Sequence, residues 1–216
     1  DVMRPSGGAL REGVLHDLVG RIHHEDVREV SAASFGERLG QDPAHGARCR
    51  TLAEGLFDQV SAALGLTPAD RLLLGWAAQL HDVGLAVAHS AYHRHGAYLV
   101  EHADLAGFST RDRQEIAALI RGQRRRPRLG SLDDLPRDRA RTVLRLLPLL
   151  RMALRMRRDR SDRPIPTPTL VAEEGRFTLL FSPGWLEGNP LTRADLDRER
   201  RHLASLDLTL ELTEST

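Results

Sequence analysis

The feature that most constrains the fold of this chain is a long succession of helical segments that ends at three closely spaced prolines. Apolar residues recur at helical spacing, and several segments begin or end at Gly, Asp-Pro or Thr-Pro, which are typical of helix termini. The expected helices are 9–21, 25–39, 43–64, 69–81, 90–102, 110–121 and 136–158. Pro164, Pro166 and Pro168 then favour an extended segment, because proline is excluded from helix interiors. The sequence therefore predicts a helical domain that ends just before these prolines.

The residues after the prolines follow a different pattern. Two β-like runs, Thr169–Ala172 and Arg176–Ser182, are separated by a short Glu-Glu-Gly turn and predict a hairpin. A helix is expected over Thr192–Leu203, with Thr192 as its N-cap, and the alternating run Asp207–Leu212 is expected to be a last strand. We therefore expect a mainly α protein in which a helical domain is followed by a small α+β C-terminal domain.

Several protein classes are excluded by simple counts. No run approaches the roughly 18 uncharged apolar residues of a membrane helix, and the N-terminus lacks the apolar core of a secretory signal. Cys49 is the single cysteine and cannot form an internal disulfide; its apolar helical surroundings favour a small buried residue over a nucleophile. These features predict a cytoplasmic protein with no membrane association. The start at Asp1, before a Pro/Gly turn, indicates a piece of a longer protein.

Charge is strongly segregated along the chain, although the total is nearly balanced at +1. Between Arg111 and Arg163 there are 17 arginines and 7 acidic residues, a net charge of +10, and the other residues carry −9. A GC-rich genome explains the absence of lysine, but it does not separate charges of opposite sign. Such a field attracts a polyanion. Aromatic residues make up only 4% of the chain, which argues against a nucleic acid whose bases stack on aromatic side chains. The alternative is a solvated face or an interdomain salt-bridge surface.

A group of histidines and one aspartate predicts a metal site. His81-Asp82 follows the end of a predicted helix, and His45 lies about 36 residues earlier on another helix. This spacing resembles HD-type metallohydrolases, in which a divalent cation polarises a phosphoryl group. Such sites also use a distal aspartate, but Leu154 and Arg157 occupy the corresponding positions, and an arginine repels a cation. We expect His45, His81 and Asp82 either to bind a metal or to be hydrogen-bonded residues of a degenerate site.

Five segments together form a pattern that is more specific than any one of them: Gly8–Leu15, Ala77–Gly84, His89–Tyr98, Asp104–Phe108 and Leu119–Arg121. With the α+β tail they resemble the C-terminal region of the exopolyphosphatase and guanosine pentaphosphatase (Ppx/GppA) phosphatase family, over essentially the whole chain. The resemblance implies three regions: the end of a truncated actin-like domain (1–21), an HD-like helical domain (22–163) and the small α+β domain (164–216).

The resemblance also implies an activity. Members are magnesium-dependent hydrolases that remove terminal phosphate from inorganic polyphosphate, or a phosphate from guanosine pentaphosphate, and their catalytic residues lie in upstream actin-like domains. On this interpretation the present chain has no catalytic residue, and Mg²⁺ belongs to the parent enzyme. Its own part would be to bind polyphosphate or another phosphate polyanion and to form a homodimer.

The main hypothesis is therefore the polyphosphate-binding and dimerisation region of an exopolyphosphatase. The candidate phosphate-binding residues are Arg121, Arg124, Arg125, Arg126, Arg128, His93, Arg94 and His95. One alternative is the same region of a guanosine pentaphosphate phosphohydrolase; others are an autonomous metal-dependent HD-type nucleotide phosphohydrolase and a purely structural dimerisation module. Gln123 stands where members often have a histidine and, with Leu154, argues against autonomous activity.

Overall fold

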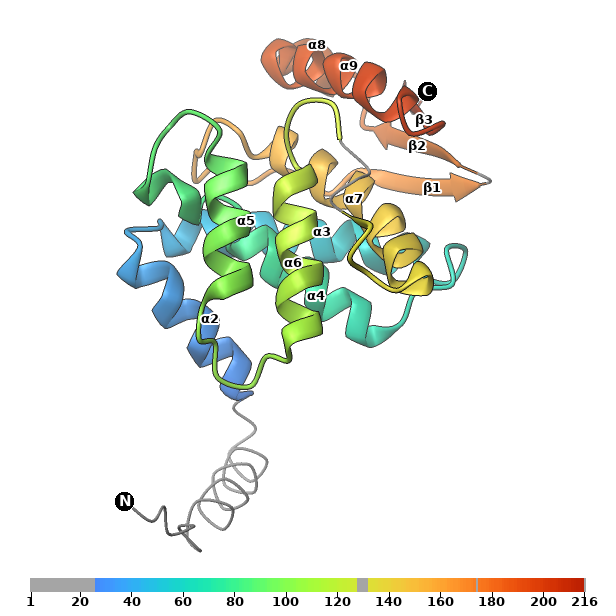
Figure 1. Cartoon of the computed structure of the whole chain (residues 1–216). Coiled ribbons are helices and arrows are strands. Elements are labelled where there is room, and N and C mark those ends of the chain that lie inside the picture. The colour runs from blue at the N-terminus through green and yellow to red at the C-terminus, as the bar shows by residue number, and fades with distance from the viewer. Residues whose placement is uncertain (1–25, 128–131, 174, 216) are drawn as a thin grey trace, which may run out of the picture.

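The computed structural model describes residues 26–127, 132–173 and 175–215, a mainly helical molecule with a small sheet at its C-terminal end (Figure 1). This confirms the predicted fold class. The helical part contains α2 (Val27–Arg38), α3 (Pro43–Val60), α4 (Pro68–Gln79), the 3-10 helix η1 (Val83–Ala86), α5 (Tyr92–His102), α6 (Thr110–Gly122) and α7 (Arg137–Met156). The predicted helix 9–21 and the actin-like remnant 1–21 lie outside the described residues.

The start of α3 is fixed by a cap that the sequence predicts. Asp42 accepts a hydrogen bond from the backbone N–H of His45, at 3.0 Å, and Pro43 occupies the first turn, where its missing N–H costs nothing. The start of α4 is fixed in the same way, by a capping box between Thr67 and Asp70. The cap on α3 determines the position of His45, because this histidine lies in the first turn of that helix.

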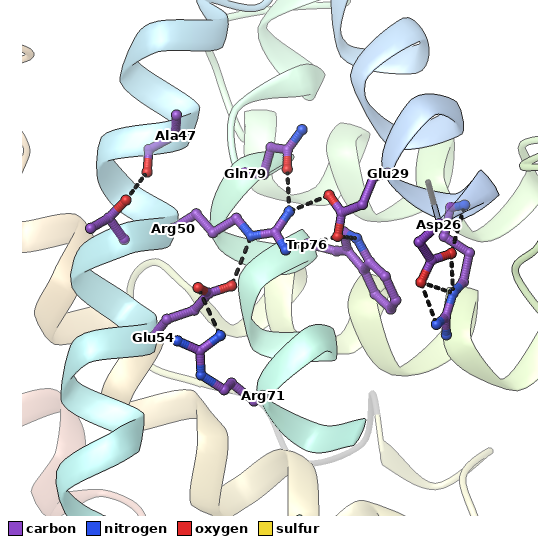
Figure 2. Close-up of polar contacts among 10 residues, drawn as sticks. Asp26, Glu29, Ala47, Arg50, Glu54, Arg71, Trp76 and Gln79 are labelled. Atoms are coloured by element: carbon purple, nitrogen blue, oxygen red, sulfur yellow. Dashed lines mark hydrogen bonds and ion pairs between the residues drawn. The ribbon is translucent and has the colours of Figure 1, made fainter. Parts of the chain in front are cut away.

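A polar network inside the helical part joins α2, α3 and α4 (Figure 2). The guanidinium of Arg50 on α3 donates to Glu29 of α2, to Glu54 one turn further along α3, and to Gln79 of α4. Glu29 also accepts a hydrogen bond from the indole N–H of the buried Trp76, at 3.0 Å. The network satisfies polar groups that would otherwise be costly to bury. It attaches α2 to the rest of the core.

The C-terminal part is a three-stranded sheet with two helices. Its elements are β1 (Thr169–Glu173), β2 (Arg176–Phe181), α8 (Trp185–Gly188), α9 (Pro190–Ala204) and β3 (Thr209–Glu214), with strand order β1-β2-β3. β1 and β2 form the predicted antiparallel hairpin, in which Leu170 pairs with Leu179. β3 runs parallel to β2, with Leu210 opposite Phe177, so the chain must cross over between them. α8 and α9 form this crossover and lie together beside the sheet (Figure 1).

Two boundary predictions in the C-terminal part are wrong. The last helix begins at Pro190 after the N-cap residue Asn189, so Thr192 is inside the helix and not its cap. Proline favours the first turn because its φ angle is already helical. The last strand begins at Thr209 and not at Asp207, whose φ of +58° places it in a turn. No helix within the described residues is long and apolar enough to cross a membrane.

Candidate functional site: two adjoining arginine-lined cavities

The first cavity is lined by α5, α6 and the turn after α6, and has a volume of about 790 Å³. The predicted phosphate-binding residues in its lining are His93, Arg94, Arg121, Arg124, Arg125 and Arg126, and its acidic residues are Glu101 and Asp134. The structure thus brings together six of the eight candidates around one space. His95 lies on α5 but lines neither of the two cavities. Arg128 lies outside the described residues.

The turn after α6 explains how consecutive arginines reach this space. A Cβ atom at Gly122 would lie only 2.8 Å from Leu147 of α7, so glycine permits the close contact of the two helices. The buried side chain of Gln123 then donates a hydrogen bond to the backbone carbonyl of His81, at 2.5 Å. Arg125 has a left-handed φ of +58°, which turns the chain sharply. This turn places both Arg124 and Arg125 in the walls of the first cavity and of a second one.

The arginines of the first cavity are free of acidic partners among the residues that the structure describes. Arg94, Arg121, Arg124, Arg125 and Arg126 form no ion pair there. The guanidinium of Arg124 instead lies over the ring of Tyr92, 4.8 Å from the ring centre. Several uncompensated guanidinium groups around one space repel each other. A phosphate group bound among them would relieve that repulsion and accept charge-assisted hydrogen bonds.

His93 contributes a neutral imidazole to the first cavity. Burial, together with the positive charges of Arg124 and its neighbours, lowers the pKa of His93 from 6.5 to about 4. Its Nδ1 atom is buried and has no hydrogen-bond partner among the described residues. His93 is therefore a polar group that is available to a ligand, and it adds no positive charge near neutral pH.

This lowered pKa predicts a loss of stability in mild acid. Between pH 6.5 and about pH 4 the unfolded chain binds a proton at His93 and the folded chain does not, so stability falls as the pH is lowered. Going from about pH 7.5 to about pH 5, we expect His93 to reduce the unfolding free energy by about 2 kcal/mol. Urea denaturation at both pH values measures this. His93→Gln should remove that part of the pH dependence, whereas His102→Gln, at an exposed position of α5, should keep it. Equal pH dependence in wild type and His93→Gln would contradict the prediction.

The second cavity adjoins the first and has a volume of about 610 Å³. Besides Arg124 and Arg125, its basic lining includes Arg155 of α7, Arg158 in the turn after α7, and Arg198 of α9. His202 and Asp195, also on α9, complete that side of the cavity. Sequence reasoning did not single out the α9 residues. They belong to no motif, and only the docking of α9 on α7 brings them to the site.

A ladder of ion pairs docks α9 against α7. Arg151 and Glu199, both completely buried, form an ion pair, and Arg155 reaches the same carboxylate at 3.1 Å. Arg158 pairs with Asp195 at 2.6 Å. These arginines belong to the positive segment of the sequence, but their charges are matched across the contact with the C-terminal part. These pairs agree with the salt-bridge alternative for these arginines, whereas the arginines that line the first cavity have no acidic partner among the described residues.

Two of the three predicted metal-binding residues, His45 and His81, form the inner wall of the second cavity, and Asp82 is not part of its lining. The rings of His45 and His81 are 5.3 Å apart, and both side chains are buried. The third donor beside them is Cys49, one turn after His45 on α3; ligand atoms of these three residues all lie within 4.8 Å of one another. The carboxylate of Asp82 accepts a hydrogen bond from the Arg160 guanidinium. Cys49 carries no metal-site signal in the sequence, because its apolar neighbours are typical of a core residue.

The protonation states at this inner wall are set mainly by burial. Burial lowers the pKa of His45 to about 4 and lowers that of His81, so both imidazoles are neutral near pH 7. Burial also raises the pKa of the Cys49 thiol to about 12. Leu154, at the position expected for a distal aspartate, lines the second cavity with an apolar side chain. The donors present here are thus imidazole and sulfur, with one carboxylate already engaged by arginine.

Comparison with known proteins gives one family. The family described as Ppx/GppA phosphatase, domain III, matches residues 27–200. A protein of Photobacterium profundum is 32% identical over 213 residues, which cover 99% of this chain and 42% of the relative. A protein of Vibrio vulnificus is 34% identical over 200 residues, covering 92% of this chain and 40% of the relative. Both relatives are named guanosine-5'-triphosphate,3'-diphosphate pyrophosphatase. The chain spans about two fifths of the length of these relatives.

Proposed function

The chain belongs to the Ppx/GppA phosphatase family, and from this premise we propose that it is the phosphate-binding region of an enzyme acting on guanosine-5'-triphosphate,3'-diphosphate. The observation that carries the proposal is the first cavity, where arginines without acidic partners in the described chain surround one space. A ligand with several phosphate groups suits it, because each group can bridge two guanidinium forks. The names of the relatives support the nucleotide as the substrate.

Inorganic polyphosphate, the main expectation from the sequence, is the second candidate. The relatives' names favour the nucleotide, but the geometry supports a longer ligand as well. Arg124 and Arg125 line both cavities, so a phosphate chain that extends from the first cavity into the second would stay in reach of these two arginines. In either case we propose that the catalytic residues and Mg²⁺ belong to the rest of the parent enzyme, and that this chain contributes ligand binding and a homodimer contact.

Calorimetric titration of the chain at two salt concentrations tests this proposal. We expect guanosine-5'-triphosphate,3'-diphosphate to bind more tightly than GTP, because it carries two more phosphate groups. If about four arginine–phosphate contacts form, the logarithm of the affinity should fall against the logarithm of salt with a slope of about −3. An affinity that does not change with salt would contradict binding in the arginine cavities.

Two further measurements separate the alternatives. A polyphosphate of matched charge that binds far more tightly than the nucleotide, and displaces it, would favour the second candidate. Phosphate release should require the upstream region of the parent enzyme, so the chain alone should release none from either ligand. Release by the chain alone, abolished in His81→Ala, would instead indicate an autonomous metal-dependent hydrolase.

A further inference from the structure

The group formed by His45, Cys49 and His81 has no part in the proposed phosphate binding, and it has the character of a second site. All three side chains are buried, and their ligand atoms lie within 4.8 Å of one another. We propose that these three residues hold a soft divalent cation of the Zn²⁺ class, with a water molecule from the adjoining second cavity or a reoriented Asp82 carboxylate in the fourth position. This differs from the set expected from the sequence by the inclusion of the cysteine sulfur.

The distance between two of the donors agrees with a tetrahedral zinc site. Zinc lies about 2.3 Å from a cysteine sulfur and about 2.0 Å from a histidine nitrogen, so at a tetrahedral angle two such ligands are about 3.6 Å apart. The observed distance from Cys49 Sγ to His45 Nε2 is 3.6 Å. The same distance allows a weak hydrogen bond between thiol and imidazole. A cation between these two atoms would replace that contact.

The orientation of His81 also suits a metal ligand. Its Nδ1 atom lies 2.8 Å from the backbone carbonyl oxygen of Ala78, which requires the proton on Nδ1. The lone pair of Nε2 is then free. Histidines that bind metals are commonly held in this way, with the other ring nitrogen donating to a carbonyl or carboxylate. The end of α4 therefore fixes the tautomer that a cation needs.

Asp82 directly follows His81, but its carboxylate is not among the ligand atoms that lie within 4.8 Å of one another. Its side chain is 3% exposed, and its Oδ1 atom is buried with no hydrogen-bond partner in the described residues. Its other oxygen is engaged by the guanidinium of Arg160, whose side chain is 42% exposed and so has room to move outward. Arg160 thus holds a positive charge on the carboxylate that follows the His81 ligand. The two nitrogens and the sulfur favour Zn²⁺ over the hard cations Mg²⁺ and Ca²⁺.

Titration of the whole chain with Co²⁺, a spectroscopic substitute for Zn²⁺, tests the site. We expect one Co²⁺ per chain, with tetrahedral d–d bands and a thiolate-to-cobalt charge-transfer band, and displacement of Co²⁺ by Zn²⁺. Because Cys49 is the chain's single cysteine, the charge-transfer band can have no other origin. Cys49→Ser, a nearly isosteric change, should abolish it while the circular dichroism spectrum stays unchanged.

Arg160, which pairs with Asp82, provides a second test. Arg160→Ala should tighten Co²⁺ binding by about tenfold or more, since it removes a like charge beside the cation. Arg198→Ala is the control, because Arg198 lines the same cavity but pairs with Asp195 and not with Asp82. No charge-transfer band in the wild type, a band that persists in Cys49→Ser, or a band only in Arg160→Ala would each overturn the proposal. These measurements contain no phosphate ligand, so their result is independent of the phosphate-binding experiments.

Discussion

Glu199→Ala is expected to lower the free energy of unfolding by about 3–5 kcal/mol, which would be a large part of the stability of a domain of this size. Glu199 and Arg151 are both completely buried, and the carboxylate also accepts a hydrogen bond from Arg155. Alanine would leave the Arg151 guanidinium inside the protein without a counter-charge, held only by the backbone carbonyls of Gly122 and Arg125. Chemical denaturation monitored by circular dichroism measures the loss.

Two comparisons identify the cause of that loss. Asp197→Ala is the matched control on α9: its partner is Arg200 at 3.4 Å, both side chains are about half exposed, and its cost should stay below about 1 kcal/mol. Replacing both buried partners, as in Arg151→Met with Glu199→Leu, should recover much of the stability, because neither charge then remains buried. If Glu199→Ala costs no more than Asp197→Ala, the ion pair does not dock the C-terminal part.

The double change of Arg124→Ser with Arg125→Ser should weaken binding of guanosine-5'-triphosphate,3'-diphosphate by about a hundredfold or more at low salt. Each hydrogen bond to a charged group contributes about 1.5–3 kcal/mol, and these two arginines stand in the wall shared by both cavities. The slope of affinity against salt should also become shallower, because two contacts are lost. Calorimetric titration of wild type and variant gives both quantities.

The control variant also removes two positive charges, but at positions outside both cavities. Arg137 and Arg141 are exposed residues at the start of α7, and they line neither cavity. Arg137→Ser with Arg141→Ser should therefore reduce affinity only slightly, through the general field. Equal losses in the two double variants would show that the ligand responds to total charge and not to the cavity. A change of oligomeric state in the Arg124/Arg125 variant, with binding preserved, would favour the purely structural dimerisation module.

Much of the fold follows from local signals in the sequence. Asp42-Pro43 and Thr67-Pro68 identify two helix starts, because capping and proline geometry depend only on adjacent residues. The parallel pairing of β3 with β2 follows from no such signal: it requires contacts between residues far apart in the chain. The same holds for α8, which is too short to show a helical period.

The candidate site was only partly predictable, for a similar reason. The arginines after α6 could be found because they are contiguous, and the structure places them around one space. Which other arginines are neutralised could not be read from the sequence. Arg151 and Arg158 meet acids about 40 residues away. Likewise Cys49 is brought to His81 by the packing of α3 against α4.

The ion pairs that Arg151, Arg155 and Arg158 form with Glu199 and Asp195 give α9 the role of an internal counterion. Its carboxylates occupy guanidinium groups that would otherwise compete with the turn after α6 for the same phosphates. On the proposed function, the acids of α9 would therefore determine which of the arginines that line the two cavities remain open to a phosphate ligand.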